Sequence, residues 1–228
     1  MNDDFEAILF DLDGTLVDTA PDMLSALFDM MNAYGKSVLN DEIARASVSN
    51  GSLALVQLGF PDDGAQRHED LQQEFLDRYE EIICRASVSS IVFPGLSELI
   101  DALDQGGRPW GIVTNKPQRM TTPLLDRLGL ADRAACAISG DTLPERKPHP
   151  APLLLGCEQI GVAPDKTIYV GDARRDIEAG RAAGMLTVAA AYGYIMADDN
   201  PELWGADEMV ANTKELAKML LKAVNLAV

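Results

Sequence analysis

The chain has 228 residues, of which 47% are hydrophobic and 24% are charged, and its formal net charge at pH 7 is -17. This length suffices for one large domain or two modest ones, each with an apolar core. The excess of acid repels nucleic acid and anionic membrane surfaces, so we expect neither as a partner. An anionic substrate would need a locally positive site, which a metal ion and one or two lysines would supply.

The cysteines and the N-terminus indicate a cellular compartment. Cys84, Cys136 and Cys157 lie far apart and are odd in number, which argues against a disulfide framework. The acidic N-terminus lacks the basic start and apolar centre of a signal peptide, and no apolar run has the length of a membrane span. We therefore expect a cytoplasmic protein without a membrane partner. The oligomeric state, monomer or dimer, stays open.

The first apolar segment, residues 8–10, ends in two carboxylates spaced two apart, Asp11 and Asp13, followed by Gly14. This pattern predicts a buried strand that delivers acids to a sheet edge, where Gly14 permits a sharp turn. Two oxygen donors on a tight turn suit Mg²⁺, which takes few protein carboxylates. The alternative is an acidic loop that only closes a strand, because short motifs match by chance often.

Residues 18–90 have apolar side chains at helical spacing and contain no convincing strand. The spacing predicts helices over residues 18–33, 41–48, 52–58 and 65–86, which together form an all-α insertion. His68, within the charged last helix, is expected to be solvated. The turn formed by Asn50, Gly51 and Ser52 is the candidate loop for contact with substrate, because glycine permits close backbone approach. An ordinary turn between two helices is an equal alternative.

From residue 93 onward, short apolar strands alternate with helices. Strands are predicted over residues 110–113, 134–138, 167–170 and 186–190, and helices over residues 96–105, 120–128, 152–160 and 174–183. This alternation is typical of an α/β fold with a doubly wound, Rossmann-like parallel sheet. Because the first strand precedes the helical segment, residues 1–17 and 92–228 are predicted to form the core and residues 18–91 an inserted all-α cap. Connections near residues 17–21 and 87–94 would be hinges.

Two further motifs follow predicted strands and carry groups that bind phosphate. Thr114 and Asn115 precede a helix N-terminus, where hydroxyl and amide groups suit an anion. Starting that helix is their simpler role. Lys147 is followed by Pro148 and Pro150, and these prolines would hold the lysine at a defined place. A lone lysine is otherwise a solvated surface charge.

A last motif places two more acids at a strand end. Asp172 follows the strand over residues 167–170, and Asp176 lies one helical turn later on the same face. Helix capping alone would explain Asp172. Beside the first pair of acids, however, these carboxylates would complete a site for a hard cation.

The motifs in this order resemble those of phosphatases of the haloacid dehalogenase superfamily, in the phosphoglycolate phosphatase-like branch with a helical cap. The resemblance covers nearly the whole chain and implies a magnesium-dependent hydrolase of carbohydrate metabolism, a phosphomonoesterase that acts on a small phosphorylated metabolite. It implies that Asp11 is the nucleophile, which forms an aspartyl-phosphate, and that Asp13 is the general acid and base. An acid at this position favours a phosphoester over a haloacid, because an alkoxide leaving group needs a proton.

The same resemblance implies roles for the other residues. Thr114, Asn115 and Lys147 would bind phosphate, and Asp172 would bind the metal together with Asp11 and the carbonyl of Asp13. Asp176 and Gly14 would support the site, Asp176 through water or by holding Lys147. One departure is Ala173, where relatives often have a polar residue.

The C-terminal stretch, residues 192–207, suggests a narrower group. Its Tyr192, Tyr194 and Trp204 are similar to residues in enzymes first labelled phosphoglycolate phosphatase, one group of which acts on N-acetylmuramic acid 6-phosphate. Aromatic packing against the core is the alternative explanation. The candidate substrates are therefore 2-phosphoglycolate and N-acetylmuramic acid 6-phosphate.

Two other functions remain as alternatives. A phosphosugar mutase would use the same nucleophile but return the phosphate from a longer-lived aspartyl-phosphate. A non-enzymatic receiver-like domain would be phosphorylated on aspartate to switch a partner, although Asp13 and the helical insertion argue against it.

Overall fold

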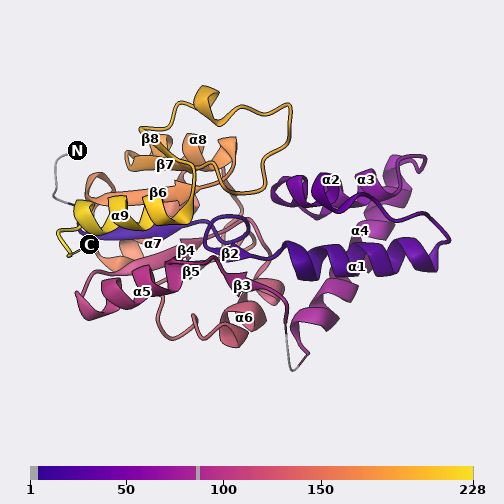
Figure 1. The fold of residues 1–228 in the computed structure, drawn as a ribbon, viewed down its shortest axis with the longest axis horizontal. Helices are drawn as coiled ribbons and strands as arrows, with labels where there is room; N and C mark the ends of the chain where they lie inside the picture. Colours follow the sequence, from indigo (N-terminus) through magenta and orange to yellow (C-terminus); the bar gives the residue numbers. More distant parts are fainter. Residues whose placement is uncertain (1–4, 86–87, 228) are drawn as a thin grey trace.

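A computed structural model describes residues 5–85 and 88–227 of the chain. It has two parts, a sheet with helices on both faces and a group of helices beside it (Figure 1). The strands are β1 (Ala7–Phe10), β2 (Val17–Asp18), β3 (Ile91–Val92), β4 (Trp110–Val113), β5 (Ala137–Ile138), β6 (Thr167–Gly171), β7 (Leu186–Ala190) and β8 (Glu208–Val210). The helices are α1 (Ala20–Ala33), α2 (Asp41–Ala46), α3 (Ser52–Gly59), α4 (Ala65–Ile83), α5 (Leu96–Gln105), α6 (Gln118–Arg127), α7 (Ala151–Ile160), α8 (Arg174–Ala183) and α9 (Thr213–Ala223).

The large sheet has six strands in the order β5-β4-β1-β6-β7-β8, and all of its neighbouring strands are parallel. This order confirms the predicted α/β class and Rossmann-like core. The first strand of the chain lies between β4 and β6, so the residues that follow these three strands are neighbours at one sheet edge. The fold therefore brings segments more than 100 residues apart in sequence to one place.

The central strand β1 is buried on both faces, as expected of a strand in a parallel sheet. Successive side chains on a strand point to opposite faces. Ile8 and Phe10 accordingly belong to the core that includes α5 and α9, whereas Leu9 belongs to the core that includes α7 and α8. Helices on both faces thus hold the strand that ends in the first acidic motif.

Helices α1 to α4 form the second part, which we call the cap, and they lie together beside the carboxyl edge of the sheet (Figure 1). Its apolar core is separate from the two main cores of the sheet and contains the buried aromatic residues Phe60, Phe75 and Tyr79. His68 was predicted to be solvated, and this prediction is wrong. The residue is only 8% exposed, and its Nε2 lies 2.8 Å from the carbonyl oxygen of Phe60.

A two-stranded ribbon joins the cap to the sheet. β2 pairs antiparallel with β3, with Val17 opposite Val92 and Asp18 opposite Ile91. The ribbon was not predicted, because two-residue strands show no measurable periodicity. It lies in the two predicted hinge segments, of which residue 87 falls outside the described residues.

Several predicted boundaries shift by a few residues. The helix predicted over residues 41–48 ends at Ala46, because the Ser47 hydroxyl donates to the Ile43 carbonyl and a 3₁₀ turn (Val48–Asn50) follows. The strand predicted over residues 134–138 begins only at Ala137, since the amide of Ala134 closes a turn onto Leu130. The helix predicted over residues 65–86 ends at Ile83. Residue 86 lies outside the described residues. β8 and α9 were not predicted.

In the described part of the chain, none of the helices combines the length and hydropathy that a membrane-spanning segment requires.

Candidate active site

The carboxyl ends of β1, β4 and β6 deliver the predicted site residues to the sheet edge that faces the cap (Figure 1). Asp11 follows β1, Thr114 follows β4, and Asp172 follows β6 directly. The backbone N–H of Asp11 donates to the Val170 carbonyl at 2.8 Å, so the polypeptide after β1 is held against β6.

Three buried carboxylates, those of Asp11, Asp172 and Asp176, form a cluster at this edge. One carboxylate oxygen from each of them lies within 4.8 Å of the other two. Burial, together with the charges of Asp11 and Asp176, raises the pKa of Asp172 to about 8. The pKa of Asp11 is raised as well, mainly by burial and against the opposing effect of Lys147. Such a cluster is favourable in its ionised form only beside positive charge.

Lys147 supplies part of that positive charge. Its Nζ lies 2.8 Å from Oδ1 of Asp11 and 2.7 Å from Oδ1 of Asp176. It also donates to the Val113 carbonyl at 2.9 Å and to the Tyr169 hydroxyl at 2.8 Å. Burial alone would lower the pKa of this ammonium, but the two carboxylates raise it above its usual value. Lys147 is therefore a charged, fully buried group.

Asn115 positions Lys147 through the backbone. Its Nδ2 donates to the Lys147 carbonyl at 3.0 Å, and its Oδ1 accepts from the Lys147 N–H at 3.1 Å. The sequence had suggested a phosphate contact for Asn115, but both polar atoms of its side chain are engaged with this loop. The Thr114 hydroxyl, the other expected phosphate group, is buried and accepts the N–H of Lys116 at 3.1 Å.

The side chain of Asp13 lies apart from the acidic cluster. Its Oδ1 accepts a hydrogen bond from the Thr19 hydroxyl at 2.6 Å and lies 2.9 Å from Nζ of Lys116. The cluster of three contains Asp176 and not the Asp13 carboxylate. Sequence analysis assigned no role to Lys116, although this lysine directly follows Asn115 in the predicted phosphate loop.

Gly14 allows Asp172 to lie against the turn after β1. Its φ is +78°, and a Cβ atom there would come 2.1 Å from Oδ2 of Asp172. Gly193 confines the same side chain from the other side, because its Cβ would lie 2.2 Å from that of Asp172. The absence of two side chains thus makes the space that Asp172 occupies.

Replacing Gly14 with alanine is expected to destabilise the protein and to abolish activity. Gly129→Ala is a matched control, because Gly129 has a φ of +67° and open space around its Cβ position. The control should lose only the cost of a left-handed alanine, about 1–2 kcal/mol. Urea denaturation and kcat/KM measure both variants, and equal losses in the two would show that the approach of Asp172 to Gly14 is unimportant.

The cap reaches the acidic cluster through Ser49, one residue before the predicted loop. The Ser49 hydroxyl donates to Oδ2 of Asp172 at 2.6 Å, and its carbonyl accepts a hydrogen bond from Arg175 on α8. Ser52 instead accepts from Gln72 within the cap, at 2.8 Å. All three residues of the predicted loop, Asn50, Gly51 and Ser52, line the cavity described below. Neither Ser49 nor Arg175 was predicted, since a serine in a turn and an arginine in a helix carry no distinctive signal.

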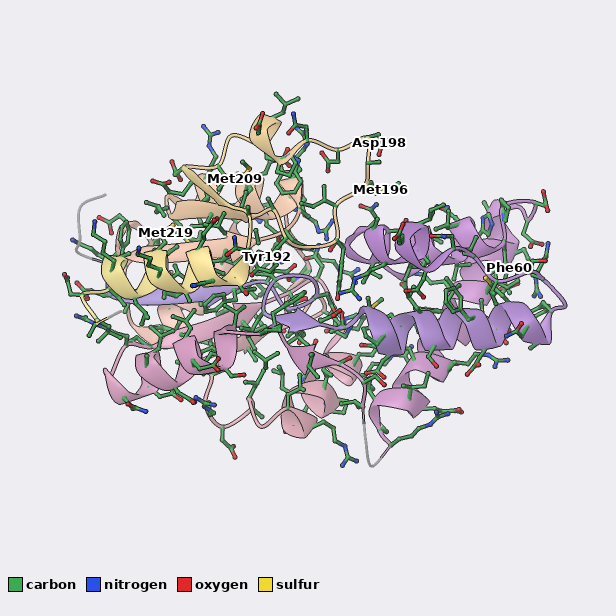
Figure 2. The ribbon with its side chains drawn as sticks, viewed as in Figure 1. Phe60, Tyr192, Met196, Asp198, Met209 and Met219 are labelled. Atoms are coloured by element: carbon green, nitrogen blue, oxygen red, sulfur yellow. The ribbon has the colours of Figure 1, made fainter. Side chains whose placement is uncertain are left out.

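The loop after β7 closes another side of the site. Tyr194 donates its backbone N–H to Oδ2 of Asp172 at 2.8 Å and its hydroxyl to Asp18 at 2.7 Å. The hydroxyl of Tyr192 donates to the Thr15 carbonyl at 2.7 Å. Farther along, Met196 lies where this loop approaches the cap (Figure 2), and Nδ2 of Asn50 is 2.9 Å from its sulfur. These tyrosines pack against the core and also hold the first motif and Asp172.

A cavity of about 550 Å³ lies between the cap and the sheet edge. Asp11, Asp13, Thr114 and Lys116 line its floor, and the cap supplies an apolar and amide wall. That wall contains Met23, Val48, Leu53, Gln72, Gln73, Phe75, Leu76 and Tyr79. The cavity has the size of a site for a small organic molecule, with convergent polar groups at one end.

The residues present fit a divalent cation. The buried Oδ1 of Asp11 accepts no aligned hydrogen bond from the described residues, although the Lys147 ammonium lies 2.8 Å away. Asp11, Asp172 and Asp176 offer only oxygen ligands, the type that Mg²⁺ prefers. A bound cation would also favour the ionised form of Asp172, whose pKa is raised by burial and by repulsion from Asp11 and Asp176.

Known proteins are similar to this chain in sequence and in fold. The model of the haloacid dehalogenase-like hydrolase family matches residues 8–190. The N-acetylmuramic acid 6-phosphate phosphatase of Pseudomonas aeruginosa is 43% identical over 220 residues, 96% of either chain. A phosphoglycolate phosphatase of Xanthomonas campestris pv. campestris strain 8004 is 45% identical over 210 residues, 92% of this chain and 94% of the relative.

A crystal structure of a predicted phosphoglycolate phosphatase from Haemophilus somnus 129PT is also similar. Its TM-score is 0.81 at 27% identity, and the match covers 95% of this chain and 98% of that one. The chain belongs to the haloacid dehalogenase-like hydrolase family. Within this family it is an enzyme of the phosphoric monoester hydrolase class, as the sequence resemblance implied.

Proposed function

We propose that this enzyme is a magnesium-dependent phosphatase that hydrolyses a small phosphorylated acid or sugar acid through an aspartyl-phosphate on Asp11. One observation carries the proposal. The carboxylate of Asp11 lines the cavity, belongs to the acidic cluster and lies 2.8 Å from the Lys147 ammonium. Asp13, two residues later, lines the same cavity with a carboxylate outside that cluster.

In the first step, a carboxylate oxygen of Asp11 attacks phosphorus as the bond from phosphorus to the ester oxygen breaks. Asp13 donates a proton to the departing oxygen, so that an alcohol leaves rather than an alkoxide. Lys147 and the Thr114 hydroxyl stabilise the negative charge on the phosphoryl oxygens. When bound at Asp11, Asp172 and the Asp13 carbonyl, Mg²⁺ would neutralise further charge on that group.

In the second step, water attacks the phosphorus of the aspartyl-phosphate, and Asp13 accepts the proton of that water. The bond between Asp11 and phosphorus breaks, inorganic phosphate leaves, and the Asp11 carboxylate is regenerated. Asp176 keeps Lys147 in place through both steps, supported by their 2.7 Å contact. Asn115 holds the same lysine through hydrogen bonds to its backbone.

The cap, residues 18–91, is proposed to close over the site and to select the substrate with the turn at Asn50, Gly51 and Ser52. Residues 1–17 and 92–228 would form the catalytic core. Hinges at the β2–β3 ribbon would permit this closure. We propose a cytoplasmic enzyme, consistent with its free cysteines.

The names of the relatives suggest two substrates, N-acetylmuramic acid 6-phosphate and 2-phosphoglycolate. The volume of the cavity, about 550 Å³, supports the sugar acid, because a two-carbon acid would leave much of it empty. The apolar part of the wall, with Phe75 and Leu76, offers surface for an acyl group or a sugar face. The kcat/KM values for phosphate release from the two compounds test which of them is the better substrate.

Release of inorganic phosphate from neither compound nor from any other phosphoester would contradict the proposal. Accumulation of a stable phosphoenzyme that transfers its phosphate to a second sugar would indicate a mutase instead.

Removing the divalent cation with excess chelator is expected to lower kcat/KM by about two orders of magnitude or more, because a metal contributes several kcal/mol at a phosphoryl group. Added Mg²⁺ should restore the rate. Ca²⁺ should restore less, since it prefers more ligands at longer distances. Undiminished phosphate release in excess chelator would remove the metal from the mechanism.

A further inference from the structure

The carboxylate of Asp13 is held at one oxygen only. The Thr19 hydroxyl at 2.6 Å and the Lys116 ammonium at 2.9 Å both contact Oδ1. Among the described residues, the hydrogen bonds of this side chain fall on Oδ1, which leaves Oδ2 for the cavity that Asp13 lines. The two contacts on Oδ1 fix the direction in which Oδ2 points.

Lys116 is an unusual group to find at this place. Its side chain is only 4% exposed, and its Nζ lies 4.5 Å from the centre of the Tyr79 ring. Burial alone would lower the pKa of the ammonium, but Asp13 and Tyr79 raise it above its usual value. The enzyme thus buries a second charged lysine within its site, in addition to Lys147.

The two lysines contact different acids. Lys147 contacts Asp11 and Asp176, whereas Lys116 contacts Asp13 and the ring of Tyr79. Tyr79 belongs to α4 of the cap, and Lys116 belongs to the loop between β4 and α6 of the core. The contact between them therefore links the cap directly to the residue that holds Asp13.

We propose that Lys116 is a positioning residue that holds Oδ1 of Asp13 so that Oδ2 meets the ester oxygen of the substrate, and that Tyr79 makes this hold depend on the position of the cap. The inference rests on the proposed function, in which Asp13 protonates the leaving group. Loosening Asp13 should therefore lower kcat/KM, which reports the step in which the alcohol leaves, most for esters whose leaving group needs that proton.

The test is the dependence of kcat/KM on the leaving group, measured with a series of substituted phenyl phosphates. p-Nitrophenol leaves readily without a proton, while phenol, with a pKa of about 10 like tyrosine, leaves poorly. For Lys116→Met we expect a loss of about 3-fold with p-nitrophenyl phosphate and about 100-fold or more with phenyl phosphate, within the range that general acid catalysis contributes. A plot of log kcat/KM against leaving-group pKa should become steeper.

Arg67→Met is the matched control. Arg67 lies on α4, as Tyr79 does, and its guanidinium lies 5.3 Å from the centre of the Tyr34 ring. It does not line the cavity. This cation–π contact lies within the cap. Its loss should not change the slope of log kcat/KM against leaving-group pKa from that of the wild-type protein.

An equal loss for every member of the series in Lys116→Met would overturn the inference, because it would mean that Lys116 binds the phosphoryl group or only stabilises the cap. Tyr79→Leu provides a second variant in case Lys116→Met does not fold. It should steepen the slope in the same direction by a smaller amount, and an unchanged slope would count against the inference. A wild-type protein that hydrolyses none of these esters would instead contradict the proposed function.

Discussion

Asp11→Asn is expected to lower kcat by about four orders of magnitude or more, because an amide does not displace an ester oxygen from phosphorus. The fold should persist, since amide and carboxylate have nearly the same shape. The change also replaces one of three crowded buried carboxyl groups with a neutral amide, so thermal stability should hold or rise. Steady-state phosphate release and a thermal melt measure the two effects.

The exposed Asp126 on α6 offers a control for the loss of one negative charge. Asp126→Asn should retain the wild-type rate. Substantial hydrolysis of p-nitrophenyl phosphate by Asp11→Asn itself would exclude Asp11 as the nucleophile.

Lys147→Met should abolish turnover and also destabilise the fold. The substitution leaves Asp11 and Asp176 buried without the ammonium that now lies 2.8 and 2.7 Å from them. Removing one partner of a buried ion pair costs about 3–5 kcal/mol. The midpoint of urea denaturation should fall accordingly.

A double variant separates the two effects of Lys147. Asp176→Asn added to Lys147→Met removes one uncompensated charge, so about 1 kcal/mol or more of stability should return. Activity should not return, because the phosphoryl group still lacks its cation. If the double variant is no more stable than Lys147→Met, the pairing with Asp176 does not explain the loss.

Four strands of the large sheet were predictable because they are long enough to show their pattern. β1, β4, β6 and β7 are buried apolar segments, each followed by a break in periodicity, and helices separate all but the first from the strand before it. The ribbon of β2 and β3 and the three-residue strand β8 are too short for such a signal. His68 lies three residues before Leu71 and seven before Phe75, so helical spacing places it on the buried face of α4, and its charged neighbours in the sequence hid this. Only its partner, the carbonyl of Phe60, could not be read from the spacing.

The candidate site was predictable where motifs directly follow strands. Asp11, Asp172 and Lys147 converge because parallel strands end at one edge and a loop is fixed beside it. The contacts of Ser49, Arg175 and Lys116 depend on how the cap lies against the core, which no local pattern encodes. Asn115 shows the same limit, because its motif indicated an anion and its partners are backbone atoms of Lys147.

A crystal structure of the enzyme with Mg²⁺ and beryllium trifluoride, a mimic of a phosphoryl group on aspartate, tests the central claim most directly. We expect the beryllium to be bonded to an Asp11 oxygen, Lys147 to lie within hydrogen-bonding distance of a fluorine, and the cation to lie between Asp11 and Asp172. Beryllium bonded to another residue, or a cation bound away from these carboxylates, would contradict the proposed mechanism.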